Sequence, residues 1–274
     1  MCIAAFLWKS HPRYPFVLLL NRDEHYNRPT TALAWWENGE ILGGKDGLAG
    51  GTWLACNRTG KLAFLTNVRE KATLPARNSR GDLPVRFLKS EKSPKEFGEE
   101  LVGQVEEYNG FNLVAADLRA MTIVYITNRP KDNGLSVTEV SPGIHVLSNA
   151  KLDTPWPKAL RLRRSFEDVI GKCFEGEISV KDMTEGIMKD TNKDDECELP
   201  GILSPDYEYA ASAIFVEANL PSGPYGTVST SAVTMKYGGE ICFYERSLEK
   251  DLWREQTISY RIETEKIASR PIRG

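Results

Sequence analysis

The second residue of the chain has the side chain whose chemistry stands out. Cys2 follows the initiator methionine, which is normally removed when the next residue is as small as cysteine. Removal would leave a thiol and a free α-amine on adjacent carbon atoms. The amine has a pKa of about 7.7–8.0 and a thiol of about 8.5, so near neutral pH the amine can accept the thiol proton directly or through a water. Nucleophile and base would then both come from Cys2, and no histidine is needed.

Two apolar runs near the start of the chain, Cys2–Trp8 and Phe16–Leu20, are separated by a polar turn and predict a β-hairpin. The second run ends abruptly in Asn21-Arg22-Asp23-Glu24. In a hairpin the end of the second strand lies beside the start of the first. The sequence therefore places Arg22 and Asp23 close to Cys2.

The charges of Arg22 and Asp23 suit a thiol nucleophile. The arginine would favour the thiolate and lower the pKa of Cys2, and the aspartate could accept a hydrogen bond from the protonated α-amine. Adjacent residues of a continuous strand point to opposite faces, so both side chains reach one site only if the strand ends or bulges there. The simpler interpretation is a surface turn with an internal ion pair.

The rest of the sequence must supply the elements that hold these residues. Two more hairpins are expected, Gly51–Ala55 with Lys61–Thr66 and Thr227–Lys236 with Glu240–Tyr244. Further strands are expected at Phe111–Ala116, Thr122–Thr127, Ile144–Leu147 and Ser212–Glu217. Antiparallel hairpins, with helices grouped separately, indicate the α+β class rather than a parallel βαβ fold.

Three helices have clear start signals. Ser93-Pro94-Lys95-Glu96 is a capping box with proline at the first helical position. Thr154-Pro155 opens a second helix, and Ser179 can cap a third. The apolar residues of the second helix recur at roughly helical spacing, at Trp156, Leu160, Phe166 and Ile170. Residues 190–211 are expected to form a charged, exposed loop.

The composition is that of one water-soluble globular domain spanning residues 1–274. The net charge of −3 gives no basic field for nucleic acid or anionic lipid. No segment approaches the ~18 apolar residues of a membrane span, and no secretory signal is evident, so we expect a cytoplasmic protein. The 5 scattered cysteines favour reduced thiols over a disulfide framework, because their number is odd and no C-x-x-C pair occurs.

Familiar ligand-binding motifs are incomplete. Gly39–Lys45 matches the start of a P-loop, but Asp46 stands where a hydroxyl should hold magnesium, so we interpret the stretch as a glycine-rich turn between strands. Asp190–Asp194 opens like a calcium loop, but the required glycine is Asp195. The 3 histidines have no zinc-ligand spacing from a cysteine, and no metal site is expected.

Met-Cys before an apolar strand, followed by Asn21-Arg22-Asp23-Glu24 and Arg28-Pro29, resembles the NRDE family, also called the transport and Golgi organisation family. Other pieces match that family in order, namely Gly50-Gly51-Thr52-Trp53 with Asn57 and Gly60, then Leu65–Arg69, Leu147-Ser148-Asn149 and Tyr225-Gly226-Thr227. The resemblance covers nearly the whole chain.

The resemblance implies a fold and a set of roles. The family is similar to N-terminal nucleophile hydrolases, in particular the branch that cleaves amides of bile acids and acyl amines. This similarity implies a four-layer αββα sandwich of antiparallel sheets. Cys2 would be the nucleophile, with Arg22 and Asp23 as its supporting pair. Asn67 would be the side-chain oxyanion donor, and Asn149 would orient the α-amine or the substrate.

One position departs from the family pattern. The family usually has arginine after Tyr-Gly-Thr, and here the residue is Val228. The missing cation removes one source of thiolate stabilisation, which is consistent with an altered substrate, weak activity or no activity. Arg246 and Arg261 are the candidates to replace it in space.

Two functions follow from the sequence. The first is hydrolysis of a non-peptide C–N bond, such as that of an acyl amide, through Cys2 and without a cofactor. The second is a non-catalytic carrier on a retired hydrolase fold, which the departure at Val228 favours. A third interpretation is a structural partner protein with a vestigial pocket.

The carrier function comes from the family's association with secretory-pathway and Golgi organisation and with lipid or haem handling between compartments. The resemblance thus implies a peripheral location at the Golgi or mitochondria. Haem would be cargo rather than a resident cofactor, and His25 or Cys2 would be its axial-ligand candidate.

Overall fold

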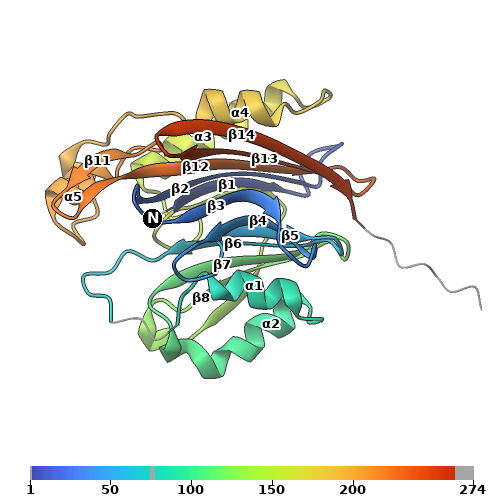
Figure 1. The fold of residues 1–274 in the computed structure, drawn as a ribbon, viewed down its shortest axis with the longest axis horizontal. Helices are drawn as coiled ribbons and strands as arrows, with labels where there is room; N and C mark the ends of the chain where they lie inside the picture. Colours follow the sequence, from blue (N-terminus) through green and yellow to red (C-terminus); the bar gives the residue numbers. More distant parts are fainter. Residues whose placement is uncertain (1, 75–77, 263–274) are drawn as a thin grey trace, which may run out of the picture.

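The computed structural model describes residues 2–74 and 78–262. Two antiparallel sheets of seven strands each lie face to face, and helices cover their two outer faces (Figure 1). Cys2 lies in the first of these sheets, sheet I, and Asn67 lies in the second, sheet II. The predicted four-layer αββα sandwich is confirmed.

Sheet I has the strand order β10-β1-β2-β12-β13-β14, and β11 pairs with β12. Its strands are β1 (Cys2–Trp8), β2 (Phe16–His25), β10 (Gly143–Leu147), β11 (Glu217–Leu220), β12 (Gly223–Met235), β13 (Glu240–Glu249) and β14 (Leu252–Arg261). Strands from the two ends of the chain thus lie side by side at β2 and β12.

Sheet II has its strands in sequence order from β3 to β9. They are β3 (Thr30–Trp35), β4 (Ile41–Asp46), β5 (Leu54–Asn57), β6 (Lys61–Asn67), β7 (Phe111–Asp117), β8 (Thr122–Thr127) and β9 (Ser136–Glu139). Every strand pairs with the strand that follows it in the sequence, so this sheet is a β-meander.

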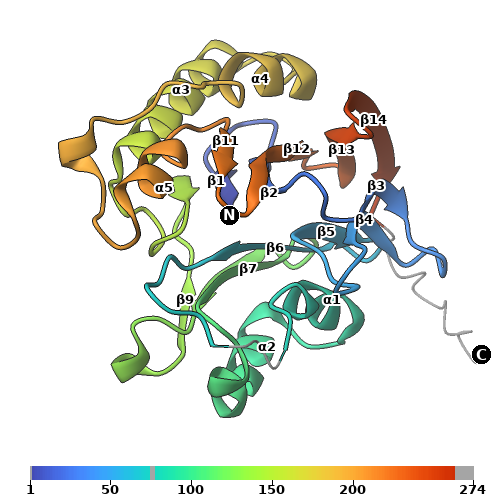
Figure 2. The same ribbon diagram turned by 60° about the vertical axis from the view of Figure 1, so that its left-hand side comes forward.

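The α-helices are α1 (Asp82–Lys89), α2 (Pro94–Glu100), α3 (Pro157–Lys172), α4 (Val180–Ile187) and α5 (Pro205–Ala210). Short 3₁₀ turns occur at Leu101–Glu107, Lys131–Asn133 and Glu196–Glu198. Helices α3 and α4 cover sheet I, and α1 and α2 cover sheet II (Figure 2).

Side-chain alternation along the strands builds the layers. On β1, Phe6 faces sheet II and its ring centroid lies 5.4 Å from that of Phe64. The next residue, Leu7, faces the other way and packs in the cluster that contains Phe166 of α3. Full burial of such side chains contributes about 1.5–3 kcal/mol each. Sheet I, which carries Cys2, is therefore packed against sheet II on one face and against helices on the other.

The predicted hairpins and two of the three predicted helix starts are confirmed, whereas the helix expected to open at Thr154-Pro155 begins at Pro157, after Trp156 and without a side-chain cap. The first strand spans Cys2–Trp8 as predicted and pairs with β2, and β5 with β6 and β12 with β13 form the other two hairpins. Ser93 and Glu96 form the reciprocal capping box, and Ser179 caps α4 by accepting from the backbone N–H of Asp182.

Several boundaries were predicted wrongly. The strand expected at Ser212–Glu217 begins only at Glu217, and residues 190–211 contain α5 rather than a simple exposed loop. The glycine-rich stretch around Gly44 is part of β4, where a Cβ atom would collide with the Trp53 ring. Glycine thus allows close packing inside the strand rather than a turn.

Candidate functional site

Cys2 is the first residue of β1, and its side chain is buried. Because Ala4 and Phe6 face sheet II, alternation places the thiol on that same inner face. In Figure 2 the start of β1 lies above β6 of the opposite sheet. Met1, whose removal would free the α-amine of Cys2, lies outside the described residues.

Arg22 is the direct partner of Cys2 across the β1–β2 hairpin. Its Nη1 donates to Thr30 Oγ1 at 2.8 Å, and its Nη2 donates to Asp46 Oδ2 at 3.0 Å. The guanidinium carbon also lies 4.1 Å from the centroid of the Trp53 ring. The predicted neighbour of the thiol is therefore a buried cation that is held in place on three sides.

Asp23 is also buried, but its side chain belongs to the other face of sheet I, because β2 continues to His25 without ending at the site. Its Oδ1 accepts from Thr227 Oγ1 at 2.7 Å. The sheet is irregular here in the partner strand, between Thr227 and Ser229 of β12, rather than in β2. Arg22 and Asp23 thus flank Cys2 from two faces of one sheet.

Arg22 lowers the pKa of Cys2, as predicted, but the net shift is upward. Burial raises the pKa of the thiol, and this outweighs the opposing effects of the Arg22 cation and of a hydrogen bond from the Asp23 backbone N–H. Arg22 is, in addition, paired with Asp46. The resting thiol is therefore protonated near neutral pH and needs a base to become a nucleophile.

Asn149 and Asn67 lie next to each other, although they are 82 positions apart in the chain. The side-chain Nδ2 of Asn149 donates to the backbone carbonyl of Asn67 at 2.9 Å. Strand β10 pairs Leu147 with Ala4, so Asn149, two residues further on, lies at the Cys2 end of β1. The structure thus gathers both asparagines at this end of the sandwich, and their catalytic roles remain predictions.

Two cations near the site, the half-buried Arg80 and the buried Lys158, were missed by the sequence analysis. Arg80 lies in the connection between β6 and α1, and its pKa is lowered by burial while Glu70 and Cys2 act in the opposite direction. Lys158 of α3 is 2% exposed, and burial lowers its pKa to about 8 against the attraction of Asp23. Arg80 thus places positive charge near the Cys2 thiol, and Lys158 places positive charge near the Asp23 carboxylate.

A signal for Lys158 was present in the sequence. Lys158, Leu162, Phe166 and Ile170 follow each other at i+4 spacing and form the buried stripe of α3. Leu160, which was assigned to the apolar stripe, is 41% exposed. For Arg80 no such signal exists, because its segment has no periodic pattern.

The cation that the family pattern expects at Val228 is not supplied by either proposed substitute. Arg246 stacks on Trp253, with its guanidinium carbon 4.3 Å from the ring centroid. Arg261 ends β14 and pairs with Glu240 at 2.8 Å, with its side chain 67% exposed. Val228 itself lies at the irregularity of β12 opposite β2. Arg80 is the additional cation that acts on Cys2.

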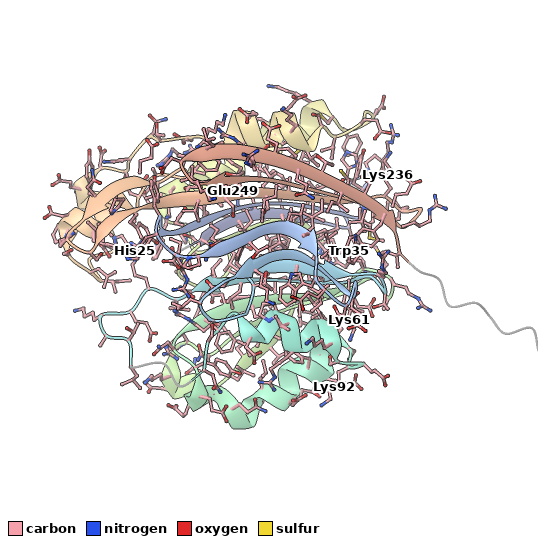
Figure 3. All side chains as sticks on the ribbon, in the orientation of Figure 1. His25, Trp35, Lys61, Lys92, Lys236 and Glu249 are labelled. Atoms are coloured by element: carbon pink, nitrogen blue, oxygen red, sulfur yellow. The ribbon has the colours of Figure 1, made fainter. Side chains whose placement is uncertain are left out.

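A hollow of about 1100 Å³ lies between α5 and β11, close to this site. Its aromatic lining comprises His25, Tyr207, Tyr209 and Tyr225. Tyr225 connects the hollow to the site, because its hydroxyl donates to the backbone carbonyl of Asp23 at 3.2 Å. His25 lies toward this end of the molecule, whereas Lys61 lies toward the other (Figure 3).

Residues 2–74 and 78–262 contain neither a cluster of metal-ligating side chains nor a membrane-spanning helix. No group of three or more histidine, cysteine, aspartate or glutamate side chains is arranged to hold a metal ion there. Among the helices of the same residues, none combines the length and apolar character required to cross a membrane.

The chain is similar to known proteins over nearly its whole length. The sequence model of the family described as "Transport and Golgi organisation 2" matches residues 1–250. The Transport and Golgi organization 2 homolog of Mus musculus is 33% identical over 276 residues, covering 95% of this chain and 98% of that protein. Its Homo sapiens counterpart is 31% identical over 282 residues, covering 96% and 100%.

The fold also matches a solved structure. The C2A mutant of a conjugated bile acid hydrolase from Clostridium perfringens superposes with a TM-score of 0.53, covering 96% of this chain and 97% of that one. Because the identity is 9%, this likeness shows the fold alone, which is that of N-terminal nucleophile hydrolases. The matches to relatives confirm the predicted resemblance. The chain belongs to the Transport and Golgi organisation 2 family, which is the NRDE family of the sequence analysis.

Proposed function

We propose that this chain is an amidohydrolase that cleaves the C–N bond of a small acyl amide with Cys2 as its nucleophile. The observation that carries the proposal is the direct pairing of Cys2 with the buried Arg22 at the start of β1. The N-terminal nucleophile hydrolase fold and the position of Asn149 at the same end of β1 support it.

In the proposed reaction the α-amine of processed Cys2 takes the thiol proton, and the thiolate attacks the amide carbonyl. Asn67, with a backbone N–H, would stabilise the oxyanion, an effect commonly worth about 3–4 kcal/mol. The C–N bond then breaks, and the α-amine passes its proton to the leaving amine. Water hydrolyses the resulting thioester, releasing a carboxylic acid and restoring the thiol.

The raised pKa of Cys2 makes the α-amine essential to this proposal. Because burial keeps the thiol protonated, Arg22 alone does not supply a thiolate. A chain that retains Met1 has no amine on the Cys2 carbon and should be inactive. Activity therefore depends on processing as well as on folding.

A panel of fluorogenic N-acyl amides tests the proposal on protein whose mature N-terminus is Cys2. We expect the unmodified chain and Cys242→Ala to turn over the substrate equally well. In Cys2→Ala, turnover should fall by roughly 10³-fold or more, as expected when a nucleophile is removed. The control removes a half-buried thiol from β13. Turnover that survives in Cys2→Ala would refute the mechanism.

The non-catalytic carrier remains the second candidate, because Val228 replaces a cation and burial opposes ionisation of Cys2. Its cargo, a lipid or haem, would occupy the aromatic hollow between α5 and β11. With His25, which lines that hollow, as the ligand of haem, this role predicts equal cargo affinity in the unmodified chain and in Cys2→Ala, and turnover in neither. For this role we propose a cytoplasmic location peripheral to the Golgi or mitochondria, which imaging against markers of both organelles tests.

A further inference from the structure

A second, smaller hollow of about 290 Å³ lies beside Asn149. Its charged lining consists of three cations, Arg69, Arg129 and Lys151, and no carboxylate occurs among its described lining residues. Asn112, Thr127 and Asn149 add hydrogen-bonding groups. This space, which we call the Arg69 hollow, is therefore complementary to an anion.

Of the two guanidinium groups in this lining, that of Arg129 is ion-paired with Glu70 at 2.5 Å, and that of Arg69 is the less satisfied. The Arg69 side chain is 2% exposed, and its contact with Glu208 is long, with Nη1 at 3.5 Å from Oε1. Its Nε and Nη2 are buried and have no hydrogen-bond partner among the described residues. Leaving a buried charge without such partners costs several kcal/mol, so a ligand that supplies acceptors would be favoured here.

The two unpartnered nitrogens have a specific geometry. Nε and Nη2 form one edge of the planar guanidinium, with two N–H bonds pointing the same way. This edge matches the two oxygens of a carboxylate, which can accept both bonds at once. One flat face of the guanidinium lies near Trp156, with the ring centroid 4.9 Å from the guanidinium carbon. The Nε–Nη2 edge is the part of this cation that lacks a hydrogen-bond partner among the described residues.

Glu208 is not free to satisfy Arg69 fully. Its carboxylate accepts backbone N–H groups from Gly201, Ile202 and Leu203 at 2.7 to 3.0 Å. Ile202 also lines the Arg69 hollow. Glu208 thus holds a turn without helix or strand structure beside Arg69, and its carboxylate is engaged by that turn rather than by the Nε–Nη2 edge.

We propose that the Arg69 hollow binds the carboxylate of a small-molecule ligand, with Arg69 as the bidentate partner and Arg129 and Lys151 as supporting charges. Asn149 lines this hollow and also lies at the Cys2 end of β1, so the bound carboxylate would lie next to the candidate catalytic site. The binding proposal does not depend on turnover.

The test uses Cys2→Ala protein, so that no hydrolysis can occur, and calorimetric titration with two matched probes. N-octanoylglycine carries a carboxylate, and N-octanoylethanolamine carries a neutral hydroxyl in its place. We expect the first to bind at least tenfold more tightly. Adding Arg69→Gln should reduce this preference to less than threefold, whereas Arg164→Gln, which removes an exposed charge from α3, should leave it unchanged.

If Arg69→Gln does not fold, the variants Lys151→Gln and Arg129→Gln test the same proposal. Lys151 is exposed and Arg129 is 14% exposed, and replacing each by glutamine should lower the preference about threefold. Equal affinity for the two probes, including no measurable binding of either, would overturn the proposal. A preference that persists in every variant of the hollow would overturn it as well.

Discussion

Cys2 and Arg22 are paired directly across the β1–β2 hairpin, on the face of sheet I that meets sheet II. The cation is fixed by Asp46 and Trp53 before any ligand arrives. Asp23, the next residue, lies on the opposite face with Thr227. Strand β2 therefore places the cation of Arg22 on the same face as the Cys2 thiol and the carboxylate of Asp23 on the opposite face.

Replacing Arg22 by glutamine should raise the pKa of Cys2 further, because the cation that opposes the effect of burial is lost. A rise of about one unit would slow alkylation of Cys2 by iodoacetamide at pH 8 about tenfold. In Arg22→Gln the carboxylate of Asp46 stays paired, because Arg28 lies 2.6 Å from it. Arg58→Gln is the matched control, because Arg58 also stacks on a tryptophan. An unchanged rate in Arg22→Gln would contradict the assigned role.

Asn149→Ala should both destabilise the fold and reduce turnover. The lost Nδ2–H leaves the Asn67 carbonyl without this donor, which costs about 1–3 kcal/mol. Urea unfolding measures the stability, and turnover of an identified amide measures the function. Asn38→Ala, at an exposed position, should change neither. A variant with normal stability and turnover would remove Asn149 from the site.

The buried Lys158 should make stability depend on pH in the alkaline range. Burial lowers its pKa to about 8 in the folded state, against an ordinary value of 10.5. Between these values the unfolded chain binds a proton that the folded chain has released, so folded stability rises with pH. This contribution is complete above 10.5 and is lost as the pH falls through about 8. Unfolding free energies at pH 7.5 and 10 should therefore show a smaller rise in Lys158→Met, and an equal rise would contradict the assignment.

Glu245 should have the opposite effect near neutral pH. It accepts from the backbone N–H of Leu33 in sheet II, and burial raises its pKa to about 7 from 4.5. The folded chain then holds a proton that the unfolded chain releases, so stability falls as the pH rises from 4.5 through about 7. The loss is on the order of 3 kcal/mol from the conversion of about 1.4 kcal/mol per pKa unit. In Glu245→Gln, urea unfolding at pH 5 and pH 8 should show a smaller loss, and an identical loss would refute the prediction.

The parts of the site that come from local sequence could be predicted. Cys2 and Arg22 meet because one hairpin brings its two strand ends together, and a polar turn between apolar runs is sufficient to indicate that hairpin. The capping box at Ser93 is equally local. Resemblance to the family supplied Asn67 and Asn149, which meet across 82 positions.

The other parts depend on long-range packing. Asp23 meets Thr227 because β2 lies beside β12, although their residues are more than 200 positions apart. The effect of Arg22 on the pKa of Cys2 was predicted correctly, but the larger, opposite effect of burial was not, because burial depends on the whole sandwich. Lys158 was missed because the stripe of α3 was assigned through Leu160.

The most direct test of the account is the intact mass of the protein from its native cell, before and after brief treatment with a thiol alkylator. The account predicts a chain without Met1, in which Cys2 is alkylated faster than the other four cysteines although it is buried. That result would show an amine-activated nucleophile. A chain that retains Met1, with no preference for Cys2, would contradict the hydrolase proposal and leave the carrier as the function to test.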